Sequence, residues 1–151
     1  MFYHKRLAFS MIELVFVIVI LGILAAIAVP KFAATRTDAQ ITKGKSDVSS
    51  IRSAIISERQ SRLIRGDSSW INSLSASATT LFDGNGSVSL LMYGIASDTT
   101  DGHWRTTSTA FPYIHYAYKI GSDDCFFDYS TNGKFDLNTS SSATICSKLV
   151  N

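Results

Sequence analysis

The sequence predicts an α+β fold in which one long N-terminal helix packs, along its second half, against a small antiparallel sheet. Three observations predict it. Residues 9–29 are almost uninterruptedly apolar, residues 31–65 repeat apolar side chains at helical spacing, and the region after residue 66 combines turn-rich links with short strand-like segments. The predicted parts are a leader (1–8), a membrane-spanning helix (9–30), an amphipathic helix (31–65) and a head (66–151).

The first apolar run is long enough to cross a membrane. From Phe9 to Val29 the only charged residue is Glu13, and at 1.5 Å per residue the run covers about 31 Å, close to the ~30 Å hydrocarbon core. Lys5 and Arg6 precede it and should stay cytoplasmic, which sends the chain after Pro30 to the other side. A charge costs roughly 2.5–3.5 kcal/mol at the bilayer centre, so Glu13 is expected to have a function.

Two simpler readings of this run stay open. A cleaved secretory signal would use Ala26-Ile27-Ala28 as its small-residue site, but such signals have apolar regions of roughly 7–15 residues and this one is longer. A plain membrane anchor explains the hydrophobicity and leaves Glu13 unexplained.

The N-terminal segment resembles that of type IV pilins and of the pseudopilins of type II secretion systems. The resemblance covers residues 5–32 and depends on the joint spacing of five residues: Ala8, Phe9, Glu13, Gly22 and Pro30. Ala8 departs from the pattern, because glycine is commoner at that position.

The resemblance implies a pilin-like fold and a route of assembly. A prepilin peptidase would cut between Ala8 and Phe9 and methylate the new amino terminus of Phe9. Glu13 of one subunit would pair with that terminus on a neighbour, and because an unpaired buried charge costs several kcal/mol, the pair would act as a register device. The implied partners are the peptidase, other pilin or pseudopilin subunits and an inner-membrane assembly platform.

Two residues of the span weaken a helix. Gly22 lacks a side chain, and Pro30 removes a backbone hydrogen bond and clashes with the preceding turn, which predicts a bend or local melting between Ala26 and Pro30. Simple tolerance of Gly and Pro in a membrane helix would account for either residue alone.

Beyond Pro30 the apolar residues form a stripe at helical period, which predicts a helix to about Arg65 that ends at Gly66. The residues of the stripe, with two alanines beside it, are Ile41, Val48, Ile51, Ile55, Ala39 and Ala54.

Charge is distributed unevenly along the chain. Residues 31–65 carry eight basic and three acidic side chains, whereas residues 66–151 carry four basic and eight acidic ones. A basic helix and an acidic head suit contacts between subunits, although a solvated helix face explains the basic stripe equally well. Nucleic-acid binding is a minority hypothesis, because no aromatic residue interleaves the basic face before Trp70. That face comprises Lys45, Arg52, Arg59 and Arg62.

The head is predicted to begin with an ordered connecting loop, residues 66–89, pinned by scattered apolar side chains. Those side chains are Trp70, Ile71, Leu74, Leu81 and Phe82. Strands are then predicted at Val88–Ile95, Tyr113–Ile120, Cys125–Tyr129 and Lys134–Leu137. The Asn132-Gly133 pair predicts a hairpin turn between the last two strands.

Cys125 and Cys146 are the two cysteines of the chain. In an extracytoplasmic head they are expected to form a disulfide that stabilises the fold by roughly 3 kcal/mol. Free thiols or a metal site are less favoured, because no histidine lies nearby in the sequence.

A calcium site is a minority hypothesis. Oxygen-bearing residues alternate before Gly133 as in the first half of an EF-hand loop, but Thr139 stands where the closing Glu belongs. A plain hairpin is the favoured interpretation, and no cofactor is expected. The candidate ligands are Asp128, Ser130, Asn132 and Asp136.

The sequence contains no recognisable catalytic motif. His103 and His115 lack a nucleophile or acid at a useful spacing, and there is no phosphate-binding glycine loop. The sequence therefore predicts a non-enzymatic structural subunit of a type IV pilus or pseudopilus. It would be held in the inner membrane with a periplasmic head before assembly. The alternatives are a competence pilin-like protein for DNA uptake and an anchored envelope protein unrelated to filaments.

Overall fold

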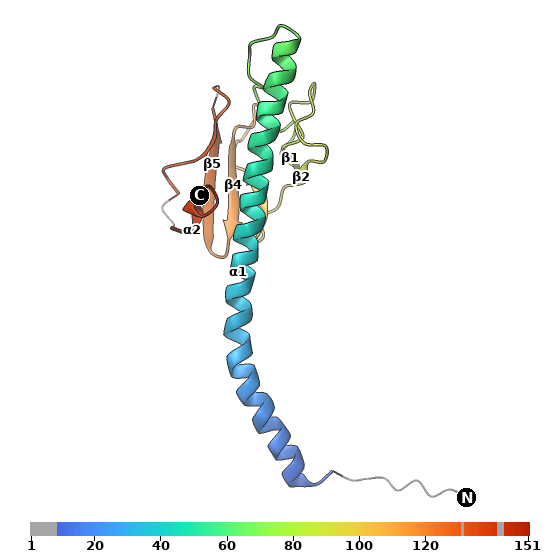
Figure 1. The fold of residues 1–151 in the computed structure, drawn as a ribbon, viewed down its shortest axis with the longest axis vertical. Helices are drawn as coiled ribbons and strands as arrows, with labels where there is room; N and C mark the ends of the chain where they lie inside the picture. The colour runs from blue at the N-terminus through green and yellow to red at the C-terminus, as the bar shows by residue number, and fades with distance from the viewer. Residues whose placement is uncertain (1–8, 131, 142–143) are drawn as a thin grey trace, which may run out of the picture. The chain divides into compact units, whose positions relative to one another are not determined.

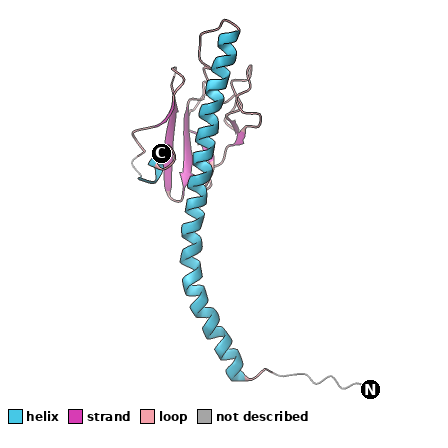
Figure 2. Ribbon diagram, viewed as in Figure 1, coloured by secondary structure: helices cyan, strands magenta, loops and turns pink. Residues whose placement is uncertain are grey.

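The computed structural model describes residues 9–130, 132–141 and 144–151, and it has the predicted α+β fold (Figures 1 and 2). The chain forms two compact units, Met1–Arg36 and Thr37–Asn151, and helix α1 (Met11–Ile64) begins in the first and ends in the second. The second unit holds the sheets and the short helix α2 (Thr144–Ser147).

Both ends of α1 are capped by local hydrogen bonds. The Ser10 hydroxyl accepts the Glu13 N–H at 3.2 Å, which satisfies one of the free donors of the first turn. At the other end Gly66 adopts a φ of 81°, and the N–H of Asp67 bonds to the carbonyl of Arg62 at 3.0 Å. This is a Schellman arrangement, which glycine accommodates without strain. The predicted end of the helix, near Arg65 and Gly66, is thus correct to within one residue.

The first unit holds the apolar part of α1. An 18-residue window of the helix has a mean hydropathy of 3.1, and by length and composition α1 can cross a membrane. The helix continues through Pro30, so of the predicted bend or local melting between Ala26 and Pro30 the melting is wrong for this structure, and the bend stays a prediction. A proline lacks one N–H donor, and the hydrogen bonds on either side suffice to keep the segment helical.

In the second unit α1 buries the predicted stripe. Val48, Ile51 and Ile55 are at most 1% exposed, and Ile41 packs partly buried beside them. Ala39, expected beside the stripe, is exposed instead.

Gly44 completes this stripe where the helix lies closest to the sheet. A Cβ atom at Gly44 would lie 2.6 Å from Cε1 of Tyr118 and 2.8 Å from Cδ2 of Leu149. No real Cβ is found that close, so the missing side chain lets the Tyr118 ring pack on the helix backbone. The Tyr118 hydroxyl donates to the Gln40 carbonyl at 2.9 Å, which fixes this contact.

The main sheet has four antiparallel strands in the order β3-β4-β5-β6. Their bounds are β3 Trp104–Thr106, β4 His115–Ile120, β5 Asp123–Tyr129 and β6 Phe135–Leu137. A two-stranded sheet pairs β1 (Thr80–Leu81) with β2 (Ile95–Ala96). The second half of α1 lies beside β4 in Figure 1.

The predicted strand over Val88–Ile95 is wrong, since only Ile95 belongs to a strand. The chain before Ile95 folds back on the connecting loop instead. The N–H of Leu90 bonds to the Asp83 carbonyl at 3.3 Å, and the N–H of Leu91 bonds to the Phe82 carbonyl at 3.1 Å. The apolar run therefore reflects partial burial of loop side chains rather than sheet pairing.

Aromatic side chains fill the core between the helix and the sheet. Trp104 is fully buried and lies edge-on to Phe82, with ring centroids 5.4 Å apart. Phe127 and Phe135, from neighbouring strands, stack at 5.2 Å. The connecting loop is pinned as predicted, because its side chains enter the same core. The buried residues of that loop are Ile71, Leu74, Leu81 and Phe82.

Candidate functional site

Phe9 is the first described residue of the predicted processing site. It precedes the capping residue Ser10 and is 78% exposed. Ala8, on the other side of the predicted scissile bond, lies outside the described residues. An exposed residue in front of the helix is compatible with access by a peptidase and with modification of a new amino terminus.

Glu13 lies in the first turn of α1 and is exposed. Its neighbours are apolar: Ile12, Val15, Phe16 and Val19 surround it. Within the described part of the chain its carboxylate has no hydrogen-bond or ion-pair partner. The positive end of the helix dipole favours an anion at this place, and no basic side chain among the described residues compensates the carboxylate.

Gly22 and Pro30 sit inside the continuous helix. A Cβ atom at Gly22 would meet nothing within 4 Å, so no contact within the chain requires glycine there. The prediction that these two residues weaken the helix stays a prediction.

The sequence of this segment matches a known family. A family model described as the prokaryotic N-terminal methylation motif matches residues 3–29. The chain carries the signature of the type IV pilin and pseudopilin family. The resemblance stated from the residues alone is thereby confirmed for the N-terminal segment. No curated protein and no solved structure gives a significant match.

The basic face of the pilin-like helix contacts the head of the same chain. Arg52 donates to the Phe135 carbonyl at 2.9 Å and to the Asp136 carboxylate at 3.1 Å. Arg59 donates to the Ser69 carbonyl at 2.7 Å, and its guanidinium lies 4.8 Å from the centre of the Trp70 ring. These contacts engage two of the side chains that a nucleic acid would have to reach.

The other two residues of that face are also engaged. Arg62 pairs with Glu58 at 2.8 Å and with Asp67 at 3.3 Å, and Lys45 donates to the Asn151 carbonyl. The backbone N–H of Ser69 and its hydroxyl lower the pKa of the Asp67 carboxyl, so Asp67 carries full charge beside Arg62 at neutral pH. All four side chains of the basic face therefore contact groups of the same chain.

The two cysteines form the expected disulfide. Cys125 and Cys146 are bonded, with Cα atoms 5.3 Å apart, and both are fully buried. Cys125 lies in β5 and Cys146 in α2, so the bond fastens the C-terminal helix to the sheet. No free cysteine remains.

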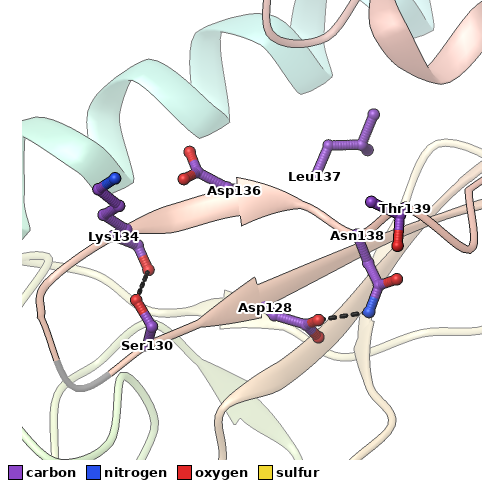
Figure 3. Close-up of a pocket in the computed structure, with 7 residues that line it drawn as sticks. All are labelled: Asp128, Ser130, Lys134, Asp136, Leu137, Asn138 and Thr139. Atoms are coloured by element: carbon purple, nitrogen blue, oxygen red, sulfur yellow. Dashed lines mark hydrogen bonds between the residues drawn. The ribbon is translucent and has the colours of Figure 1, made fainter.

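The proposed calcium ligands are held in other contacts (Figure 3). Asp128 bonds to His115 Nδ1 at 2.7 Å and accepts from the Asn138 amide. Ser130 contacts Asn132 within the hairpin turn, and Asp136 binds Arg52. Figure 3 shows that the carboxylates of Asp128 and Asp136 do not converge.

Three of them, Asp128, Ser130 and Asp136, line a pocket of about 310 Å³ together with Lys134. No group of three His, Cys, Asp or Glu side chains suited to a metal ion occurs in the described parts of the chain. The arrangement therefore does not fit a calcium cage, and the expectation that the chain has no cofactor stays a prediction. The hairpin itself forms as expected, with Gly133 at a φ of 80° and its N–H bonded to the Ser130 carbonyl at 2.9 Å.

The structure shows one ionisable group that sequence reasoning missed. Asp47 accepts the indole N–H of Trp104 at 3.0 Å, and burial raises the pKa of its carboxyl against the opposing effects of Trp104 and Lys43. The signal available in the sequence was its position next to Val48, at the border of the apolar stripe. A carboxylate there must find a donor in the sheet that covers the helix.

Proposed function

We propose that this chain is a structural subunit of a type IV pilus or of a secretion pseudopilus. The observation that carries the proposal is the methylation motif over residues 3–29, which coincides with the start of a helix apolar enough to cross a membrane. A prepilin peptidase would remove the leader at the Ala8–Phe9 bond and methylate Phe9. The subunit would wait in the inner membrane with its head in the periplasm.

The charges of the helix support polymerisation over simple anchoring. A plain anchor gains nothing from a carboxylate at Glu13, which costs free energy in an apolar environment. An ammonium group on the Phe9 terminus of a neighbouring subunit would compensate it, and opposite charges attract strongly where the dielectric constant is low. Partners would then be other pilin or pseudopilin subunits and the membrane platform that assembles them.

The head supports a structural rather than a catalytic role. His103 bonds to the Thr100 hydroxyl at 3.0 Å and His115 to the Asp128 carboxylate at 2.7 Å, and both partners lie on the head surface. The basic helix face contacts the head itself, which speaks against the competence-type alternative in which this face captures DNA. The proposal includes no cofactor.

Mass spectrometry of the chain purified from membranes tests the proposal. We expect the mature protein to start at Phe9 and to carry one methyl group on that amino terminus. An intact Met1, or a start at Val29, would contradict the proposal. The first result would indicate an unprocessed membrane anchor and the second an ordinary secretory signal.

Glu13→Val tests the assembly role separately from processing. The variant should be inserted and cleaved, because the peptidase acts at Ala8–Phe9, but it should enter filaments poorly when the wild-type subunit competes. Ile12→Val, a conservative change at the adjacent exposed position, is the control and should assemble normally. Equal incorporation of the Glu13 variant would remove the charge-pairing argument.

A further inference from the structure

Two segments of the head have the form of acceptor sites for asparagine-linked sugars. The first reads Asp83-Gly84-Asn85-Gly86-Ser87 and the second Asp136-Leu137-Asn138-Thr139-Ser140. Each has Asn-x-Ser without proline at x, which is the minimal acceptor sequence in exported proteins. Each also has an acidic residue two positions before the asparagine.

The acidic residue makes the signal specific. Serine and threonine are so frequent in residues 66–151 that a serine two positions after an asparagine carries little information by itself. Acidic residues are scarcer there, since the head has eight Asp and no Glu. Both matching segments nevertheless have Asp at the same place, and Asp/Glu-x-Asn-x-Ser/Thr is the extended form that bacterial oligosaccharyltransferases recognise.

The first segment lies in the loop between β1 and β2, and the second runs from the end of β6 into a turn; Asn85 and Asn138 are half-buried. Gly86 and Ser87 are exposed, as are Thr139 and Ser140. The side chain of Asp136 is 62% exposed and pairs with the partly exposed Arg52. An enzyme can therefore reach the residues that follow each asparagine.

The two asparagines share one local geometry. Asn85 Oδ1 accepts the N–H of Ser87 at 3.2 Å, and Asn138 Oδ1 accepts the N–H of Ser140 at 2.7 Å. A hydrogen bond to the amide oxygen draws electron density from the amide nitrogen and makes its proton easier to lose. The neutral amide nitrogen is a poor nucleophile, so the attack on a sugar depends on removal of this proton by a base, which the hydrogen bond makes easier.

We propose that the head carries N-linked glycans on Asn85 and Asn138; this rests on the proposed function, which puts the head outside the cytoplasm. The donor is an oligosaccharide linked to a polyisoprenyl pyrophosphate. The asparagine Nδ2 forms a bond to C1 of the sugar while the bond from C1 to the phosphate oxygen breaks. The Nδ2 proton goes to a base of the transferase, and the lipid pyrophosphate leaves.

The geometry ranks the two acceptors. Asn85 Nδ2 donates to the amide oxygen of Asn72 at 2.9 Å, a neutral partner on the surface. Asn138 Nδ2 donates to the carboxylate of Asp128, and this segment lies inside the loop closed by the disulfide. A bond to a carboxylate is stronger than one to a neutral amide. We therefore expect Asn85 to be the more completely modified site.

Peptide mapping of the full chain purified from its own cells tests the proposal. Trypsin separates the sites, because residues 66–105 contain Asn85 and residues 135–148 contain Asn138. Each peptide should carry a sugar mass, which Asn85→Gln and Asn138→Gln should abolish one at a time. Ser87→Ala should abolish modification of the first peptide while Ser87→Thr retains it. Asn132→Gln, which alters no acceptor sequence, should leave both peptides modified.

The same sample reports the state of the amino terminus, which keeps the two proposals distinguishable. Unmodified peptides from a chain that starts at methylated Phe9 would overturn glycosylation and leave the proposed function standing. Unmodified peptides from a chain with an intact Met1 would overturn both. A sugar that persists in both Asn→Gln variants would be attached to another residue and would also overturn this assignment.

Discussion

The two halves of α1 are one helix with opposite burial. In the first half the large apolar side chains face outward, and Ile18, for example, is 57% exposed. In the second half Ile51 is fully buried under the sheet. The same helical hydrogen bonds form in both, so local structure does not depend on where the apolar surface is covered. The second half finds its cover within the chain, whereas the first half requires a lipid or protein environment.

The two glutamates of α1 repeat this contrast in charge. Glu58 is 8% exposed and accepts from Arg62 at 2.8 Å, with Arg65 at 3.7 Å. Glu13 has no side-chain partner within the described residues. A buried charge is tolerated when it is paired. Glu58 therefore has its partners at the C-terminal end of the same helix, whereas Glu13 would obtain one only in the proposed pairing with a neighbouring subunit.

Shortening the chain should have the largest effect, because it removes the first half of α1 alone or most of both halves. A chain that starts at Phe32 keeps the stripe and should be a soluble, folded monomer. A chain that starts at Ile56 loses Val48, Ile51 and Ile55, each contributing roughly 1.5–3 kcal/mol by burial, against a total stability of about 5–15 kcal/mol. It should aggregate and show no cooperative thermal transition by circular dichroism. If both chains melted equally cooperatively, the helix would not support the sheet.

One substitution made in each half should separate the two environments. Ile51→Ala leaves a cavity in the core and should destabilise the head by about 2–5 kcal/mol in a denaturant titration. Ile18→Ala removes no packing within the chain and should leave the same transition unchanged. Equal effects at the two positions would mean that the first half also supports the folding of the head.

The two helical glycines offer a finer version of the same experiment. Gly44→Ala places a Cβ 2.6 Å from the Tyr118 ring and should destabilise the head by about 1–3 kcal/mol through overpacking. Gly22→Ala meets open space and should leave the head unaffected while favouring the helix by about 0.5–1 kcal/mol. Thermal melts of the two variants, compared with wild type, measure this difference. A neutral Gly44→Ala would show that Tyr118 can move aside.

The smallest expected effect concerns Asp47 and its pH dependence. Its pKa is raised in the folded state, so its protonation favours folding, and this contribution is present below the unfolded value near 3.8 and is lost as the pH rises through the folded pKa. Asp47→Asn stays neutral and can still accept from Trp104, so it should be more stable than wild type at pH 7, by less than about 1 kcal/mol. The difference should shrink in acid.

Urea titrations of wild type and Asp47→Asn at several pH values would measure that difference. Comparison with wild type cancels the contributions of the other carboxyls, including Asp67 and Asp98, whose lowered pKa values act with the opposite sign. A variant less stable at neutral pH would show that the bond from Trp104 to a charged acceptor outweighs the desolvation of the carboxylate.

The sequence predicts best what depends on short-range periodicity. Val48, Ile51 and Ile55 recur at helical spacing, and the Asn132-Gly133 pair has a strong turn preference, so both were found. Gly44 was missed because its importance depends on a tyrosine more than seventy residues away. The prediction of a strand over Val88–Ile95 was wrong. An apolar run indicates that its side chains are buried, but it does not specify which backbone groups its N–H and C=O groups bond to.

The residues of the candidate site also differ in how well the sequence predicts them, depending on whether their contacts are local or distant in the chain. The residues of the N-terminal motif lie at fixed spacings on one helix, so one sequence suffices to detect them. The contacts of Arg52 and Arg59 join the helix to strand β6 and to the loop after Gly66, respectively. No pattern within the helix distinguishes an arginine that binds its own head from one that faces solvent. Strand β3 could not be predicted from the sequence either, because three residues are too few to show the alternation of a strand.

The disulfide between Cys125 and Cys146 also limits how far the head can be stretched. Their separation in sequence is 21 residues, and an extended chain spans up to about 3.3–3.6 Å per residue. When the head is pulled from its ends, the disulfide therefore prevents the extension of roughly 70 Å of chain. A head with reduced cysteines would extend by that additional length. A subunit subjected to tension keeps β5, β6 and α2 within one covalent ring, and mechanical rupture of the rest of the head leaves this ring closed.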